Sequence, residues 1–401
     1  MKIKLAGGVG EYGRSAFLIS DNHNTLLLDA GIMKGNGILE SQRYPVLTKE
    51  EIQEVTSVFI THSHEDHCGA VPFLIEKGFN GKIYSTEETQ SQIRAQQLLP
   101  EPIMESQWQI LSMDNGQQQM ALGNRLTIQW GMNGHMPGSV WYMLTGKKHR
   151  IFYSGDFSPE SSLMAYQKPI SRRTDLVIVD AAYGEDCQEQ ADLIGKMFAA
   201  MEQCLKKGGK VLIPVPGQGR GLDLLALFVN RNYYWKVPLL VEEKIARAFE
   251  ACQNKEEWLH SKGKKLLRTF LQEKEMMTRF TEKQQLENNW KEGILLVDGA
   301  MMESPLAQHF YNQMQEKDLV ILNGNQAANT MGSRLLKELR TSGRPETIQI
   351  RYNVHMDEKR AMQLADCLRA KTKIPFHSKQ PLSEGKGWEN RKPGDVIYLL
   401  V

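Results

Sequence analysis

The sequence predicts an α/β protein in which one domain is inserted into another. The first third of the chain consists of short apolar or alternating runs separated by Gly- and Asn-rich turns, which is typical of β-strands. From about Asp175 onward, apolar runs alternate with helical segments, which is typical of parallel βαβ units. No Pro- or Ser-rich linker separates the two patterns, and this favours insertion over domains joined end to end.

The predicted elements follow from where the apolar runs begin and end. In the first part, we predict a helix over residues 69–78 and a loop over 31–47. In the second part, helical spacing covers residues 187–206 and a longer, charged region covers 242–292. Residues 261–268 hold four basic and no acidic side chains, which we interpret as a solvated helix face. The predicted strands are residues 2–6, 15–20, 24–31, 56–63, 81–86, three runs within 125–155, and then 175–180, 210–215, 237–241, 293–298 and 318–324.

Composition excludes several classes of protein. The 401 residues include 49 Lys+Arg and 47 Asp+Glu, so the net charge is only +2 and any site for a polyanion must be local. Five cysteines with no C-x-x-C pair argue against a disulfide framework and a cysteine-rich zinc module. Residues 1–15 lack the apolar core of a signal peptide, and no apolar run is long enough to span a membrane. We therefore expect a cytoplasmic protein with no membrane partner.

Three histidines and an aspartate lie within six residues, directly after an apolar strand: His62, His64, Asp66 and His67. A buried polar side chain needs a hydrogen-bonding partner, so a group this dense does not fit ordinary core residues well. Imidazole and carboxylate are ligands that zinc accepts. The alternation of His62 with His64 and the adjacent pair Asp66 and His67 point to two sides of the loop, which indicates up to two ions.

Two further ligands are expected at other strand ends. His135 lies in a Gly-rich turn between two strands, and Asp156 follows an apolar strand and Gly155. Taken alone, His135 favours a structural role, and Asp156 fits a turn residue equally well. Together with the first cluster, both favour metal binding. Because the two oxygens of a carboxylate can each bind one ion, Asp156 is the natural bridge.

At this point the residues resemble a known family. The motifs that carry the resemblance to the metallo-β-lactamase fold, over residues 1 to about 185, are Asp29, the cluster from His62 to His67, His135 and Asp156. Residues 10–15 and 61–72 are similar to its nucleic-acid-processing branch, which carries an inserted β-CASP domain. That branch includes bacterial ribonuclease J and the endonuclease of mRNA 3′-end processing. The resemblance implies a metallo-β-lactamase αββα sandwich with an inserted α/β β-CASP domain.

The markers of the inserted domain occur in the family's order. They are Asp180 at a strand end, Gly-rich helix starts within 210–225 and 321–336, His355 after a strand and before a helix, and His377 after the next strand. Residues 297–308 depart from the family's Gly and Ser pattern. The resemblance implies a metallo-β-lactamase domain over 1–185, the β-CASP domain over 186–345 and a return segment of the first domain over 346–401.

The resemblance also implies two zinc ions, with manganese as the alternative because the ligand types do not exclude it. Two ions about 3.5–4 Å apart can share a hydroxide and clamp both oxygens of a phosphodiester displacement. Zinc also lowers the pKa of bound water to about 7, which supplies a nucleophile at neutral pH. The implied ligands are His62, His64 and His135 for one ion, Asp66, His67 and His377 for the other, and Asp156 for both.

The leaving oxygen still needs a proton. We predict that His355 is the general acid and that Asp180 orients its ring, and we count Asp66 with them among the catalytic residues. Asp29 is interpreted as a carboxylate that orients the ligand loop through hydrogen bonds without binding metal.

Substrate phosphates are expected at backbone amides where helices begin. In the first Gly-rich turn, Gly217 and Gly219 offer such amides and Arg220 offers a charged partner. Asn325 and Thr330 are predicted to serve in the same way from the second turn.

The predicted function is a zinc-dependent nuclease that hydrolyses single-stranded RNA with a metal-bound hydroxide. Exonuclease and endonuclease action both remain open, as does a homo-oligomer. The alternatives are a phosphodiesterase acting on DNA or small nucleotides, and a hydrolase of small esters, thioesters or lactams. A non-catalytic RNA-binding subunit is disfavoured because every expected ligand position is filled.

Overall fold

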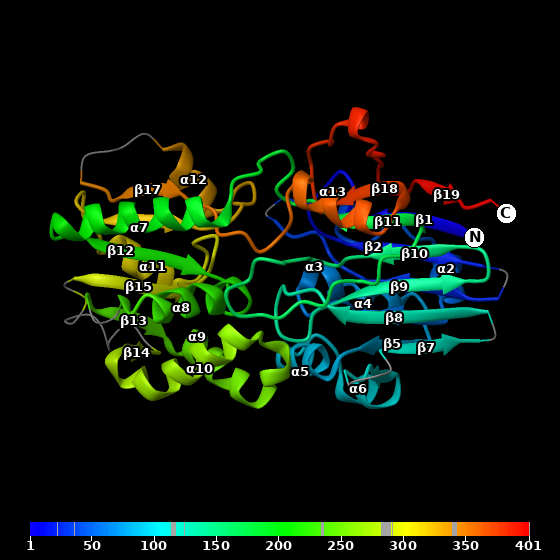
Figure 1. Ribbon diagram of the computed structural model, residues 1–401, viewed down its shortest axis with the longest axis horizontal. Coiled ribbons are helices and arrows are strands. Elements are labelled where there is room, and N and C mark those ends of the chain that lie inside the picture. The colour runs from blue at the N-terminus through cyan, green and yellow to red at the C-terminus, as the bar shows by residue number, and fades with distance from the viewer. Residues whose placement is uncertain are drawn as a thin grey trace. The chain divides into compact units, whose positions relative to one another are not determined.

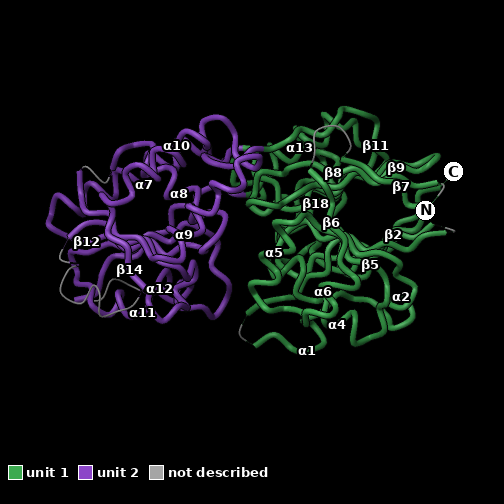
Figure 2. Tube along the Cα trace, turned by 90° about the horizontal axis from the view of Figure 1, so that it is seen from below, with its two compact units in different colours: residues 1–159, 166–187, 355–401 green, residues 160–165, 188–354 purple. Residues whose placement is uncertain are grey.

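The computed structural model divides the chain into two compact units (Figure 2). Unit 1 comprises Met1–Pro159, Tyr166–Cys187 and His355–Val401, and unit 2 comprises Glu160–Ala165 and Gln188–Val354. Unit 2 therefore takes in residues 346–354, which were expected in the return segment, as well as the short piece 160–165. The residues that the structure describes are 1–21, 23–35, 37–113, 118–123, 125–233, 236–281, 290, 292–338 and 343–400.

Unit 1 contains two β-sheets (Figure 1). The strands of the first sheet are β1 Lys2–Gly7, β2 Ala16–Ser20, β3 Thr25–Leu28, β4 Ser57–Phe59, β5 Lys82–Ser85, β6 Trp108–Ile110 and β19 Val396–Tyr398. The strands of the second sheet are β7 Gln119–Leu122, β8 Leu126–Met132, β9 Val140–Gly146, β10 Arg150–Tyr153, β11 Thr174–Asp180 and β18 Ala370–Phe376. The spatial orders are β19-β1-β2-β3-β4-β5-β6 and β18-β11-β10-β9-β8-β7.

The two sheets of unit 1 pack face to face between two layers of helices. The helices of unit 1 are α1 Glu40–Arg43, α2 Lys49–Glu54, α3 Glu65–Cys68, α4 Val71–Glu76, α5 Glu87–Ala95, α6 Glu101–Ser106, α13 Glu358–Cys367 and the 3-10 helix η5 Glu384–Lys386. Aromatic side chains join the inner faces, since the ring centroids of Phe17 and Tyr153 lie 4.9 Å apart and those of Phe59 and Tyr142 lie 5.7 Å apart. Helices α2, α4, α5 and α6 bury apolar side chains against the outer face of the first sheet, and α13 does so against the second. This arrangement confirms the predicted αββα sandwich.

Unit 2 is built around one parallel sheet in the order β14-β13-β15-β12-β16-β17. Its strands are β12 Lys210–Val215, β13 Leu239–Glu242, β14 Thr278–Phe280, β15 Gly293–Asp298, β16 Leu319–Leu322 and β17 Glu346–Gln349. Its helices are α7 Gln190–Lys206, α8 Arg220–Asn230, α9 Glu243–Ala251, α10 Ser261–Glu273, α11 Pro305–Asn312, α12 Met331–Lys337 and the 3-10 helices η2 Cys252–Trp258 and η3 Lys274–Met276.

Helices cover both faces of this parallel sheet, and for this reason its strands are apolar throughout. Successive residues of β12 alternate between the two faces. Val211 and Ile213 pack with α7 to α10, whereas Leu212 packs with α11 and α12. The strand–helix alternation read from the sequence thus produced the expected α/β unit. No helix in the described part of the chain is both long and apolar enough to cross a bilayer.

Several elements differ from the sequence-based expectation. Residues 31–47, expected as a loop, contain α1, and the charged region 242–292 contains the short strand β14. The strand expected directly before His355 ends earlier, at Gln349. The irregular stretch that follows is tied by a side chain, because Asn353 N donates to Gln190 Oε1 at 2.8 Å. The short strand β14 was missed because it has only three residues, Thr278–Phe280, two of them polar.

A buried carboxylate attaches the short piece 160–165 to unit 2. Asp223 of α8 is 1% exposed and accepts hydrogen bonds from Ser161 Oγ at 2.7 Å and Leu163 N at 3.1 Å. Burial raises the pKa of Asp223 to about 7, although these hydrogen bonds oppose the shift. Because the folded protein holds this proton more tightly than the unfolded chain, the stabilisation is complete at acid pH and is lost as the pH rises toward 7.

We predict that Asp223→Asn stabilises the protein at pH 8 by roughly 1–3 kcal/mol, because the amide keeps the acceptor oxygen and removes the buried charge. At pH 5 the carboxyl of the folded wild type is still protonated, whereas that of the unfolded chain is already largely ionised, so the Tm difference should be smaller than at pH 8. Thermal denaturation followed at both pH values measures the difference. An equal Tm difference at pH 5 and pH 8 would contradict the assignment of the raised pKa to Asp223.

Candidate metal centre

The predicted ligands of unit 1 lie where parallel strands end. β3 and β4 are parallel neighbours in the first sheet, and β10, β11 and β18 are parallel neighbours in the second. Carboxyl ends of parallel strands meet at one edge of a sheet. Four of the predicted residues directly follow or end these strands: Asp29 after β3, Asp156 after β10, Asp180 at the end of β11 and His377 after β18.

Glycines allow these strand ends to approach the ligand loop closely. Gly31 packs on the loop backbone, since a Cβ at this position would lie 1.7 Å from the carbonyl oxygen of Asp66. Gly155 has φ +54°, a left-handed conformation that a side chain would strain, and it brings Asp156 in beside Thr61. Both glycines therefore serve the geometry of the site.

One group of four residues has the spacing of a metal shell. His62, His64, His135 and Asp156 each offer one ligand atom, and these atoms all lie within 4.8 Å of one another. The distances are 3.0 Å from His62 Nε2 to His64 Nδ1 and 3.3 Å from His135 Nε2 to His64 Nδ1. Asp156 Oδ2 lies 3.4 Å from His62 Nε2 and 3.5 Å from His135 Nε2. A tetrahedral shell with ligands about 2.0–2.1 Å from zinc has ligand atoms roughly 3.3–3.4 Å apart, so the donor set fits.

The other oxygen of Asp156 faces the second set of predicted ligands. Asp156 Oδ1 lies 3.1 Å from His67 Nε2 and 3.4 Å from His377 Nδ1, and His377 Nε2 lies 3.5 Å from Asp66 Oδ2. The structure also groups His355 with Asp156 and His377 within 4.8 Å. Asp156 thus lies beside both predicted ligand sets. The ring of His355 lies close enough to Asp156 and His377 to be a metal ligand, which its predicted role as a proton donor did not require.

Three buried atoms of the predicted ligands have no hydrogen-bond partner among the described residues: His67 Nε2, Asp156 Oδ1 and His377 Nδ1. Buried polar atoms are nearly always paired, so an unpaired group of this kind is unusual. All three atoms meet at the same point between His67, Asp156 and His377. A divalent cation there would satisfy them, and this supports the fit of a metal to the residues present.

The charges of the imidazoles divide the site in two. Burial lowers the pKa of His62, His64 and His135, to about 3 for His64. These three rings are therefore neutral near pH 7, which is the form of imidazole that binds a metal.

The remaining ligands carry charge. Burial lowers the pKa of His67 and His377, but the neighbouring carboxylates, with Asp156 foremost, together outweigh it and raise both, to about 9 for His377. Burial raises the pKa of Asp66 and Asp156, but neighbouring imidazoles outweigh it, bringing that of Asp66 to about 2 and that of Asp156 well below its usual range. This half of the site thus pairs two ionised carboxylates with two protonated imidazoles.

Asp29 joins the ligand loop to both sheets without facing the other ligands. Its Oδ1 accepts from Thr61 N at 2.6 Å, and its Oδ2 accepts from Thr61 Oγ1 at 2.8 Å and Tyr153 OH at 2.6 Å. The same Oδ2 lies 2.7 Å from His67 Nδ1, so the ring turns its Nε2 toward Asp156. A carboxylate in this position orients a ligating histidine and fixes its tautomer.

Asp180 holds His355 in a similar way. Asp180 is fully buried and accepts from the backbone amides of Phe157 and Ala182, both at 3.0 Å. Its Oδ2 lies 3.0 Å from His355 Nδ1. The ring of His355 stands between those of His135 and His377, with centroids 4.9 Å from each.

Sequence reasoning missed the aromatic residues around the site. Tyr153 was read only as part of a strand, yet its hydroxyl donates to Asp29. Tyr12 and Tyr183 lie edge-on to His377 and His355, each with ring centroids 5.7 Å apart. The sequence did contain a signal for both residues, because Tyr12 lies within the motif at residues 10–15 and Tyr183 follows Asp180 by three residues.

The predicted phosphate-binding turns lie in unit 2, where Arg220 joins them. Arg220 Nη1 donates to Asn323 Oδ1 at 3.3 Å, and a Cβ at Gly324 would lie 1.7 Å from Nη1, so only glycine admits the guanidinium there. Gly219 caps α8 with φ +61°. Gly217 packs against Lys244, which pairs with Asp298.

The two remaining predicted substrate residues differ in exposure. Asn325 is exposed at the tip of the second turn. Thr330 is buried and is the N-cap of α12, since its Oγ1 accepts from Ser333 N at 3.2 Å. The cap accounts for this hydroxyl, so Thr330 has less to offer a phosphate than its position in the sequence suggested.

Known proteins share this sequence pattern and fold. Residues 24–215 match the beta-lactamase superfamily domain. The chain is 25% identical over 396 residues to transcription termination factor FttA of a Lokiarchaeum, covering 88% of this chain and 61% of that protein. It is 27% identical to ribonuclease TTHA0252 of Thermus thermophilus, over 61% of this chain and 59% of that one.

A third relative is cleavage and polyadenylation specificity factor 73 of Drosophila melanogaster, which is 29% identical over 57% of this chain and 35% of its own. The chain thus spans less than two thirds of the length of each of these relatives. A crystal structure of a protein of unknown function from Enterococcus faecalis superposes with a TM-score of 0.62, at 12% identity and 99% coverage of both chains, which supports the fold. The matched domain and these relatives thus agree with the resemblance to the β-CASP branch of the metallo-β-lactamase-fold proteins that the motifs predicted.

Proposed function

We propose that this protein is a metal-dependent nuclease that hydrolyses phosphodiester bonds in single-stranded RNA. The observation that carries the proposal is the convergence of imidazole and carboxylate ligands on both oxygens of Asp156, with His355 held beside them by Asp180. The names of two relatives, a ribonuclease and a cleavage and polyadenylation factor, support RNA as the polymer.

The ligand residues fit two divalent ions, zinc first and manganese as the alternative. His62, His64 and His135 would hold one ion, Asp66, His67 and His377 the other, and Asp156 both. Bound there, the ions would supply Lewis-acid activation of water and neutralise the phosphate in the transition state.

The protein's own groups supply the remaining chemistry. His355 turns Nδ1 to Asp180, which leaves Nε2 to donate a proton to the leaving oxygen. The two backbone amides that bind Asp180 keep this orienting carboxylate in place. Asp29 keeps His67 turned toward Asp156 while Tyr153 and Thr61 share its charge. In unit 2, Arg220 and the turns it joins would bind phosphates of the strand.

Three other functions compete with this one. DNA and small nucleotides contain the same phosphodiester, so the metal chemistry does not exclude them. Small esters, thioesters and lactams need no second unit with Gly-rich turns. A non-catalytic RNA-binding subunit would not need the complete ligand set that unit 1 retains.

Substitution of a ligand should remove metal and activity together. We predict that purified wild-type protein contains close to two equivalents of zinc or manganese by elemental analysis. His64→Ala should lower the metal content and abolish cleavage, because its Nδ1 lies within 3.3 Å of two other ligand atoms. The matched control is His23→Ala, since His23 is exposed and outside the site. Wild-type protein that binds no divalent metal would contradict the proposal.

Substitution of the proton donor should separate chemistry from metal binding. We predict that His355→Ala keeps its metal but cleaves RNA about 10²–10⁴-fold more slowly, the usual contribution of a general acid. The same variant should hydrolyse bis(p-nitrophenyl) phosphate at nearly the wild-type rate, because p-nitrophenolate leaves without a proton. Asp180→Asn should show the same pattern more weakly. Loss of metal from His355→Ala would instead make His355 a ligand, as its closeness to His377 also allows.

The substrate can be settled by direct comparison. We expect end-labelled single-stranded RNA to be cleaved faster than single-stranded DNA of the same sequence, with 5′-hydroxyl, monophosphate and triphosphate ends tested in parallel. Release of mononucleotides one at a time would indicate an exonuclease, and internal fragments an endonuclease. Cleavage of neither polymer by a metal-loaded protein would contradict the nuclease assignment and favour a small substrate.

A further inference from the structure

A groove of about 560 Å³ lies on the second sheet of unit 1 and shares no residue with the metal centre. It occupies the outer face at β7, β8 and β9, where Gln129 pairs with Gln119 on one side and Met143 on the other. Helix α13 packs on β11 and β18, at the opposite end of this sheet. Helix α13 therefore does not cover the outer face at β7, β8 and β9, and a ligand can bind to this part of the sheet.

The groove carries positive charge without compensation. Its lining includes Arg150, Lys168 and Arg172, and none of the described residues that line it is acidic. Lys168 and Arg172 are exposed and form no ion pair with any described residue. Asp175, which accepts from the backbone amide of Arg150, is paired with Lys371. In a chain whose net charge is only +2, such a surface is a local site for an anion.

The floor of the groove can form hydrogen bonds along its length. Four glutamines line it: Gln118, Gln119, Gln129 and Gln167. Gln129 Nε2 donates to Gln119 Oε1 at 2.9 Å and Gln167 Oε1 accepts from Met132 N at 3.0 Å, but each amide has two N–H hydrogens and two oxygen lone pairs, so further capacity remains for a ligand. Glutamine amides match the edges of nucleobases, which are accessible only where the bases are unpaired or face a groove.

Two tryptophans add an apolar wall. Trp130 and Trp141 line the groove, and their indole N–H groups are already used within the protein. Trp141 Nε1 donates to Gln167 O at 2.7 Å, and Trp130 Nε1 donates to Ser112 O at 2.9 Å. Both side chains are buried, at 4% and 7% exposed, so the indole surface that remains in the groove is a narrow carbon edge, which suits the edge of a base.

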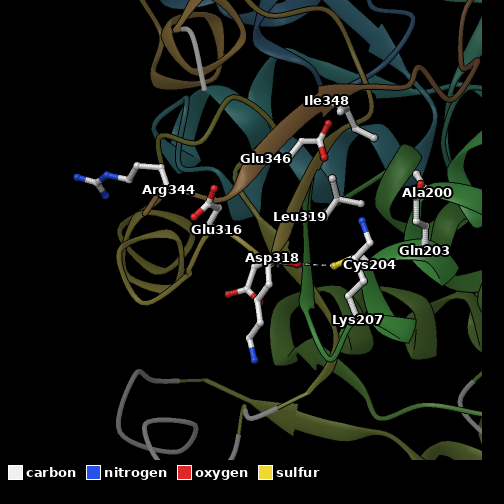
Figure 3. Close-up of a pocket in the computed structure, with 11 residues that line it drawn as sticks. Ala200, Gln203, Cys204, Lys207, Glu316, Asp318, Leu319, Arg344, Glu346 and Ile348 are labelled. Carbon is white, nitrogen blue, oxygen red and sulfur yellow. Dashed lines mark hydrogen bonds between the residues drawn. The ribbon is translucent and has the colours of Figure 1, made fainter. Parts of the chain in front are cut away.

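A second groove, in unit 2, lacks this character (Figure 3). It has a volume of about 660 Å³ and lies between the end of α7 and strands β16 and β17. Its lining contains as many acids as bases: Glu316, Asp318 and Glu346 against Lys207, Lys317 and Arg344. The charges balance there, so of these two grooves the one in unit 1 is complementary to a polyanion.

We propose that the groove of unit 1 binds single-stranded RNA at a place separate from the metal centre, a proposal that rests on the proposed function. The cations contact phosphates, the glutamines contact base edges, and the indoles pack against bases. An acidic peptide would match the cations but would not use the row of amides. A strand held here increases the local concentration of the same RNA at the metal centre, so the groove should lower KM for RNA and leave kcat unchanged.

The test measures binding without cleavage. The probe is fluorescein-labelled single-stranded RNA with phosphorothioate linkages, which resist hydrolysis, titrated with metal-loaded protein and followed by anisotropy. We expect the double variant Lys168→Glu/Arg172→Glu to bind about tenfold more weakly at moderate salt. The slope of log K against log salt should fall by about 1.4, because each phosphate contact on a single strand contributes about 0.7. Gln119→Glu, which adds a charge to the floor and removes no cation, should also weaken binding.

A matched control places the same charge change elsewhere on unit 1. Lys49→Glu/Lys77→Glu alters two exposed lysines that lie beside acidic residues, Glu50 and Glu76, and should bind RNA as the wild type does. All variants should hydrolyse bis(p-nitrophenyl) phosphate normally, which distinguishes failure of the groove from failure of the proposed nuclease.

Unchanged binding by Lys168→Glu/Arg172→Glu would overturn the proposal. So would full competition by polyglutamate, which would make the groove a site for acidic peptide. Dissociation of a dimer by the same variant, with RNA binding intact, would also overturn it, because the groove would then join two copies of the chain.

Discussion

The carboxylate of Asp156 is the interaction on which the rest of the site depends. It is 1% exposed, and its two oxygens face four imidazoles that come from three separate parts of the chain. A buried charge is costly unless opposite charge surrounds it, so these parts must stay in register. The parallel pairing of β10, β11 and β18 delivers that register, because it aligns the strand ends from which Asp156, Asp180 and His377 emerge.

Orienting carboxylates extend this constraint outward. Asp29 and Asp180 each bind the nitrogen Nδ1 of a histidine and use backbone amides to hold themselves in place. The ring of His67 thereby turns its Nε2 toward Asp156. The two arrangements differ in their neighbours, since Asp29 also accepts from Tyr153 and Thr61, whereas Asp180 otherwise binds only amides among the described residues. This difference suits a fixed metal ligand in one case and a proton donor in the other.

Charge is distributed unevenly over a chain that is nearly neutral as a whole. The metal centre would supply strong attraction for one phosphate, while the groove of unit 1 gathers cations without acids and the groove of unit 2 balances them. Electrostatic binding of a long polyanion is therefore confined to a few places. This predicts that the binding constant depends only modestly on salt concentration. The basic run at 261–268 belongs to α10, whose Leu266, Leu267 and Phe270 are buried, so its lysines lie on the solvated face that the sequence indicated.

The sequence by itself determined the fold class and most strands, and it predicted the cluster proposed to bind metal. Apolar runs and Gly-rich turns are local properties, and imidazoles and a carboxylate placed as densely as those from His62 to His67 strongly favour metal binding over a role in packing. Only the tertiary structure decided which residues meet. The sequence did not reveal that Tyr153 reaches Asp29, that Arg220 packs on Gly324, or that His355 lies as close to His377 as a ligand would. Nor did it reveal the groove, because glutamines and cations from β7, β8, β10 and the stretch after Tyr166 become neighbours only through antiparallel pairing and chain return. Contacts between residues far apart in the chain depend on strand register, and register is set by the packing of both sheet faces together.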